Sequence, residues 1–173
     1  MRNNDWLKQE LHIILNKYFS DVKISNPIEI KFGRDSKFRF GSIRLIRSTK
    51  GIKSIKGIGG ILANSLLKTR GTRGTRNPLD THINQPDRSV ITITSMFKSE
   101  DIPVSVIRHT IAHELCHYAH GFSSTNKRLF KHPHHGGIVN AELERRGAHD
   151  LIFAYKIWLK EYRKKILAGR KIF

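Results

Sequence analysis

The residues with the clearest chemical potential are His113-Glu114-Leu115-Cys116-His117, which form an H-E-x-x-H pattern. On an α-helix, residues four positions apart lie on the same face, so His113 and His117 can bind one metal ion. Zn²⁺ binds imidazole nitrogens at a Zn–N distance of ~2.0–2.1 Å. Glu114 projects ~100° from His113 around the helix axis, so it can contact a zinc-bound water without being a ligand. The pattern therefore predicts a hydrolytic zinc site.

The sequence around this pattern predicts an amphipathic helix that begins near Pro103 and ends at Gly121. Successive residues of a helix are rotated by ~100°, so an apolar stripe and a row of histidines lie on opposite faces of this helix. The stripe contains Val104, Ile107, Ile111, Leu115, Tyr118 and Phe122, and the opposite face contains His109, His113, His117 and His120. His109 and His120 lie too far along the axis to share the ion, and Cys116 is expected to be a packing residue.

A hydrolytic zinc site needs a third protein ligand and an open coordination position. The segment at 131–137, with the sequence KHPHHGG, supplies several candidates. His135 precedes two glycines at the expected start of the last helical region, so it is the expected third ligand. His134, His132 and Glu142 remain alternatives.

Apolar periodicity predicts an α+β fold around the motif. The predicted elements are helices over 5–19 and 137–168, the latter broken near Gly147, and strands over 22–32, 37–46 and 89–95. A short polar turn at 33–36 predicts that the first two strands form a hairpin. Strand 89–95 is expected to be the sheet edge that aligns an extended substrate.

The charge of the chain predicts an anionic partner. Lys and Arg total 32 against 14 Asp and Glu, which gives a formal net charge of +18. DNA is the favoured partner, an anionic membrane surface is a weaker alternative, and a merely solvated basic surface is the plainest one. The segment at 47–76 is Gly-rich and has no acidic residue, and it contains the expected nucleic-acid contacts Lys53, Lys56, Lys68, Arg70, Arg73 and Arg76.

Length and composition restrict the domain organisation of the chain and the classes of protein to which it can belong. A chain of 173 residues predicts a single domain over 1–173, in which 47–76 is a basic insert. No apolar run approaches the ~20 residues that cross a bilayer, and no signal sequence is evident at the start. One cysteine, Cys116, excludes an internal disulfide and a four-cysteine zinc ribbon. We expect a monomer that is cytoplasmic, or located in the nucleoid or nucleus, and not secreted.

From about residue 88 to 146, the sequence resembles the SprT-like zinc metalloproteases, the family that includes Spartan, a DNA-dependent protease of DNA–protein crosslinks. The shared features are a strand at 90–94, the H-E-x-x-H helix, and a His-Gly pair followed by a helix. In the family, the third zinc ligand is the His of an H-G-x-x-hydrophobic segment. That pattern falls on His135, with Val139 at the hydrophobic position.

The resemblance implies a zincin-like fold with a small, mostly antiparallel sheet and a packed C-terminal helical region. It implies one catalytic Zn²⁺ held by His113, His117 and His135, with Glu114 as the base. The implied activity is endopeptidase cleavage of DNA-associated proteins. The sequence departs from many family members in lacking the cysteines of a zinc ribbon, and the insert at 47–76 is not a family hallmark.

Two other classes compete with the protease interpretation. A non-catalytic, zinc-stabilised nucleic-acid-binding module would keep the histidine ligands and would not depend on Glu114. A metal-dependent nuclease is disfavoured, because two-metal sites use several carboxylates and the motif helix carries only Glu114.

Overall fold

The computed structural model of the chain describes residues 1–48 and 86–170, and side chains as far as 168. The chain divides into two compact units, Met1–Ile46 with Asp87–Phe173, and Arg47–Pro86. The first unit contains all the elements described below. The predicted nucleic-acid contacts Lys53, Lys56, Lys68, Arg70, Arg73 and Arg76 lie outside the described residues.

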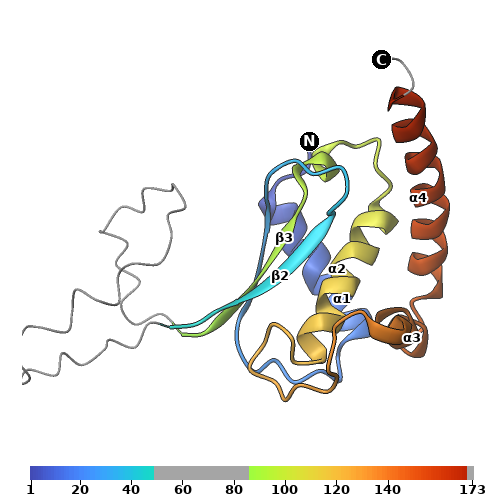
Figure 1. Cartoon of the computed structure of the whole chain (residues 1–173). Helices are drawn as coiled ribbons and strands as arrows, with labels where there is room; N and C mark the ends of the chain where they lie inside the picture. The colour runs from blue at the N-terminus through green and yellow to red at the C-terminus, as the bar shows by residue number, and fades with distance from the viewer. Residues whose placement is uncertain (49–85, 171–173) are drawn as a thin grey trace, which may run out of the picture. The chain divides into compact units, whose positions relative to one another are not determined.

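The first unit has a mixed α+β architecture, as the sequence predicts (Figure 1). In chain order its elements are α1 (Asn4–Tyr18), β1 (Ile28–Phe32), β2 (Gly41–Ile46), β3 (Arg88–Ile93), the 3-10 helix η1 (Ser95–Lys98), α2 (Val104–Ala119), the short 3-10 helix η2 (His135–Gly137), α3 (Ile138–Arg145) and α4 (His149–Arg170). The predicted break of the last helical region is confirmed at Gly147, which has a φ of 75°.

The three strands form a mixed sheet in the order β1-β3-β2. β1 pairs in parallel with β3, and β2 pairs antiparallel with β3. The predicted hairpin is therefore wrong, and so is the mostly antiparallel sheet, because β3 lies between the other two strands. Its buried residues Ser89, Val90, Ile91 and Ile93 make it the most buried of the three strands, which suits the central position.

The connection from β1 to β2 passes around the end of β3 instead of folding back as a tight turn. The backbone N–H of Gly33 donates to the carbonyl of Ile93, and the N–H of Thr94 donates to the carbonyl of Phe40, at 2.7 and 2.9 Å. The Thr94 hydroxyl accepts from the Ser36 N–H at 2.9 Å. These bonds hold the segment before β2 against the end of β3.

Helix α2 is the central helix of the unit. It packs against α1, α3, α4 and the sheet. The predicted apolar stripe is buried at Ile107, Ile111, Leu115 and Tyr118, and Cys116 is fully buried as expected. The histidine face is also largely covered, because His109, His117 and His120 are buried. A helix enclosed in this way can hold polar side chains in fixed positions.

Polar contacts fix both halves of α2. The Tyr118 hydroxyl donates to the carbonyl of Asn26 at 2.9 Å and accepts from the Asn26 N–H at 3.2 Å. Arg108 donates to the buried Glu10 of α1 through Nε and Nη2, at 2.5 and 3.3 Å. Within the described ranges, no helix combines the length and apolarity needed to cross a membrane.

Candidate metal centre and cleft

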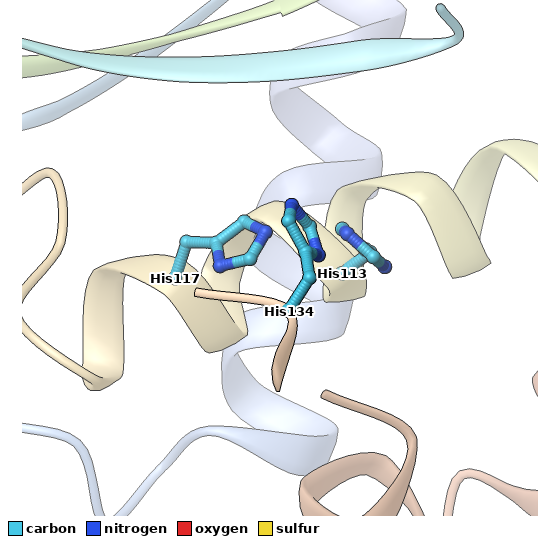
Figure 2. Close-up of side chains that lie close together, drawn as sticks. All are labelled: His113, His117 and His134. Atoms are coloured by element: carbon cyan, nitrogen blue, oxygen red, sulfur yellow. The ribbon is translucent and has the colours of Figure 1, made fainter. Parts of the chain in front are cut away.

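Three histidines from two parts of the chain converge at the surface of α2. His113 and His117 project from successive turns of α2, and His134 faces them from the loop before η2 (Figure 2). One ring nitrogen from each lies within 4.8 Å of the others. The nitrogens of a tetrahedral zinc site are ~3.3 Å apart, so small side-chain adjustments would bring all three to one ion. This group can bind a metal ion.

The third member of this group is His134, whereas the sequence analysis favoured His135. His134 lies 4.6 Å from His117 and 5.4 Å from His113, measured between ring centroids. His135 is exposed at the start of η2, and its ring neighbours that of His132 instead. Adjacent side chains project in different directions, so this turn presents only one of the two histidines to α2. Two positive-φ glycines then continue the turn at Gly136 and Gly137.

The other sequence alternatives also lie outside the group. The carboxylate of Glu142 accepts from Arg145 at 2.8 Å and from Arg146 at 2.8 Å. Its closest histidine is His120, whose Nε2 lies 4.0 Å from a Glu142 oxygen. Glu142 therefore belongs to an ion-pair cluster beside His120, the residue that caps the C-terminal end of α2.

Burial and neighbouring histidines keep His113 and His117 neutral. Burial, followed by repulsion from neighbouring histidines, lowers the pKa of His113 to about 4 and that of His117 to about 3. Both therefore have free lone pairs at neutral pH. The Nδ1 of His117 is buried and has no hydrogen-bond partner in the described part of the chain. Three imidazoles with space for a fourth ligand are a donor set that fits zinc.

Glu114 lies beside this group but is not part of it. Its side chain is 6% exposed, and burial raises its pKa to about 7. Arg39 and a hydrogen bond from the backbone of Ile43 oppose that increase. A carboxylate close to two metal-binding histidines, and not itself placed as a ligand, is the arrangement that the H-E-x-x-H spacing predicts.

The histidine group and Glu114 face a common cleft of about 570 Å³. One wall is the segment from Phe38 to Ile43, and the other includes the loop of His134. Further lining residues are His109, Thr110, Phe122, Ser123, Arg128, Pro133 and Tyr155. Of the described residues that line the cleft, Glu114 alone carries a carboxylate, and Arg39 and Arg128 supply positive charge.

The strand that borders this cleft is β2, which is an edge strand of the sheet. The expectation that strand 89–95 forms the edge is wrong, because β3 is central and both its sides are paired. The carbonyl of Ile43 in β2 accepts from the Ser123 hydroxyl at 3.2 Å. This bond joins β2 to the loop that follows α2.

Arg128 stabilises the loop that carries His134 through hydrogen bonds to the loop backbone. Arg128 donates from Nε to the carbonyl of Phe130 at 3.1 Å and from Nη2 to that of Lys131 at 2.7 Å. Its guanidinium lies 4.7 Å from the ring centroid of Phe122, and the Phe122 ring stands edge-on to that of His117. These contacts connect the loop to the end of α2.

The sequence analysis did not identify Tyr155 as a cleft residue. Tyr155 comes from α4, and its ring stacks on His109 with centroids 4.0 Å apart and an interplanar angle of 11°. His109 is buried, and desolvation lowers its pKa to about 4, aided by Lys156. The apolar periodicity of α4 indicates a packed helix and gives no sign that one of its residues reaches the cleft.

In comparisons with known proteins, no family model, no curated protein and no solved structure matches this chain. The resemblance to SprT-like proteases therefore remains a prediction from the sequence.

Proposed function

We propose that this protein is a zinc-dependent endopeptidase, with His113, His117 and His134 as the zinc ligands and Glu114 as the general base. One observation carries the proposal. Three imidazoles and a buried carboxylate outside their group face a single cleft beside an edge strand. This combination supplies what hydrolysis of a peptide bond requires, namely a Lewis acid, a base and a way to align an extended chain.

Zinc, when bound, would supply a Lewis acid that polarises the substrate carbonyl and acidifies a water. The protein supplies the proton transfer. A Glu114 carboxylate oxygen accepts the proton from the attacking water and then delivers it to the nitrogen of the leaving amine. The backbone of β2 holds that carboxylate in place through its contact with Gly41 and the hydrogen bond from Ile43.

Substrate alignment is assigned to the outer edge of β2 on either side of Ile43, whose own backbone groups already bond to Glu114 and to the Ser123 hydroxyl. An extended peptide can add to an exposed sheet edge by backbone hydrogen bonding. Because β2 borders the cleft, a peptide placed along it would pass in front of His113 and His117. Arg39 and Arg128 would attract acidic groups to this region.

The competing functions are less well supported by the site. A two-metal nuclease would need several carboxylates, and the described cleft lining has only Glu114. A purely structural zinc module would have no use for a buried carboxylate facing the cleft beside the metal ligands. Within the described part of the chain, Glu114 has no ion-pair partner. Burial of such a carboxylate is unfavourable, which favours a functional role for Glu114.

We further propose that the substrates are proteins bound to DNA. This part rests on the net charge of +18 and on the resemblance stated above. A protease that acts only beside DNA would find its targets by electrostatic attraction.

The test is cleavage of a basic DNA-binding protein by the zinc-loaded chain, with and without single-stranded DNA. Glu114→Gln is the control, because it keeps the shape of the side chain and removes the base. We expect cleavage that requires Glu114 and increases with DNA. Cleavage that ignores DNA would contradict the choice of substrate, and equal cleavage by Glu114→Gln would contradict the mechanism.

A further inference from the structure

A second hollow of about 330 Å³ adjoins the proposed catalytic cleft, between α4 and the segment that precedes β2. Phe38, Phe40 and Tyr155 line both spaces, so the two share a wall and lie side by side. We call the second hollow the α4 groove. Its other lining residues are Lys37, Leu159, Tyr162, Arg163, Ile166 and Leu167.

The walls of the α4 groove are tied together. The Tyr162 hydroxyl donates to the carbonyl of Lys37 at 3.1 Å and lies 3.4 Å from the sulfur of Met96. Phe40 packs edge-on against Trp158 and Tyr162. The groove is therefore a feature of packed elements, and its two sides keep their separation.

The rim of the groove exposes large apolar side chains to water. Phe38 is 71% exposed and Leu167 is 59% exposed. Both flank a groove that already contains the aliphatic side chains of Leu159 and Ile166. Apolar surface grouped around a hollow indicates a binding site, because covering it removes apolar area from water.

The aromatic rings of the groove favour an aliphatic or aromatic side chain over a nucleobase as the occupant. Base binding depends on free ring faces. The Tyr162 ring stacks on Trp158 with centroids 4.8 Å apart, and the Phe40 ring stacks on Phe97 at 5.5 Å. These rings contribute apolar walls, while much of their stacking surface is already used within the protein.

The charge of the groove is positive. Lys37 and Arg163 line it, and none of the described lining residues is acidic. Arg39 follows in the adjoining cleft. A ligand with an acidic group next to its apolar side chain would be complementary to this surface.

We propose that the α4 groove is a specificity subsite that binds a large apolar side chain of the peptide substrate, with an acidic residue beside it. The inference rests on the proposed peptidase function and adds the substrate class. Because the two hollows share Phe38, Phe40 and Tyr155, a peptide that lies in the cleft can place a neighbouring side chain in the α4 groove, a few residues from the scissile bond.

The test is binding of labelled peptides to the zinc-loaded Glu114→Gln protein, followed by fluorescence anisotropy. The peptides contain Phe-Glu, Ala-Glu or Phe-Lys in an otherwise identical sequence, each placed at successive positions. At one position we expect Phe-Glu to bind about tenfold more tightly than Ala-Glu, the low end for filling an apolar pocket, and more tightly than Phe-Lys.

Matched variants test whether the preferences for Phe and for Glu depend on residues that line the α4 groove. Leu167→Ser should remove the preference for Phe, while Phe153→Ser should keep it, because Phe153 is a similarly exposed residue of α4 outside the groove, 68% exposed. Arg163→Glu should remove the preference for Glu over Lys. Lys165→Glu, about 200° around the helix from Arg163, should retain it.

Equal binding of all three peptides at every position would overturn the inference. It would also be overturned if a single-stranded oligonucleotide displaced the peptide and its own affinity fell with Leu167→Ser. Hydrolysis of the same peptides by the unmodified chain separates the two proposals. Selective binding without hydrolysis would contradict the peptidase function alone, and hydrolysis without selectivity would contradict the subsite alone.

Discussion

The carboxylate of Glu114 lies directly against the backbone of Gly41. A Cβ atom at position 41 would be 2.8 Å from Glu114 Oε1 and 2.7 Å from the Cγ2 of Thr110. No side chain fits between strand β2 and this turn of α2. The edge strand that borders the cleft therefore also determines where the proposed base can lie.

Gly41→Ala should displace the Glu114 carboxylate and leave the zinc ligands in place. We expect turnover to fall by about 100-fold, the scale associated with a small misplacement of a catalytic group, with zinc affinity unchanged. Peptidase assays at equal zinc content measure this effect. Gly33→Ala is the control, because its added methyl group would crowd Thr92 in the sheet, away from Glu114. Equal losses in the two variants would contradict a specific role for Gly41.

His134→Ala should weaken zinc binding more than His135→Ala. A ring nitrogen of His134 lies within 4.8 Å of ring nitrogens of His113 and His117, and His135 is not part of this group. Losing one of three ligands should reduce affinity by more than about 100-fold, since changes outside the ligand set already cost 10–100-fold. Competition with a chromophoric chelator measures both variants. A larger loss for His135→Ala would restore the ligand set that the sequence resemblance implies.

The metal-free protein should lose stability through His109 as the pH falls. Burial lowers the pKa of His109 from 6.5 to about 4. The pKa of His109 is lower in the folded state than in the unfolded state. Its contribution to the free energy of unfolding is therefore fully present above pH 6.5 and is lost between pH 6.5 and about 4. The full loss corresponds to about 3 kcal/mol at ~1.36 kcal/mol per pKa unit.

Chemical denaturation at several pH values tests this dependence. His109→Phe keeps a ring against Tyr155 and removes the titrating group, so its free energy of unfolding should vary less with pH than that of the unmodified chain. His12→Gln, on the exposed face of α1, should keep the original dependence. The prediction would be contradicted if the free energy of unfolding of the His109→Phe protein varied with pH as much as that of the unmodified chain.

Arg146→Ala should destabilise the fold where α1, α2 and α3 meet. The Arg146 side chain is 6% exposed and donates to Glu142, to Asp21 and to the carbonyl of Tyr18. Breaking a buried ion pair costs about 3–5 kcal/mol, and we expect a loss near the lower value because Asp21 is exposed. Arg145→Ala is the control, because Arg145 contacts the same Glu142 carboxylate but is 61% exposed. Similar unfolding midpoints for the two variants would contradict the assignment.

The local elements of this fold could be predicted from the sequence, and the strand pairing could not. Pro103 and Gly121 delimit α2, and the H-E-x-x-H spacing placed His113, Glu114 and His117 on it correctly. Local turn signals at 33–36 favoured a hairpin, but the apolar strand β3 takes the central position from more than 40 residues away along the chain. Pairing over such a separation depends on the global burial of β3, which no short window reveals.

The choice between His134 and His135 also lay beyond the sequence. Both have the same chemistry, and the backbone conformation of one turn decides which of them faces α2. Tyr155 was missed for a related reason, since its position in the cleft depends on how α4 packs against α2. Spacing within one helix was informative because helix geometry is fixed, whereas relations between elements depend on tertiary packing.

Under the proposed function, one zinc ion and Glu114 together hydrolyse peptide bonds. The most direct measurement is peptide hydrolysis by the chelator-treated protein as zinc is added back, in parallel for the unmodified chain and Glu114→Gln. We predict that hydrolysis by the unmodified chain rises until one equivalent of zinc is bound and then levels off. Glu114→Gln should bind the same equivalent and remain inactive. Hydrolysis that survives zinc removal, or that is equal in Glu114→Gln, would contradict the account.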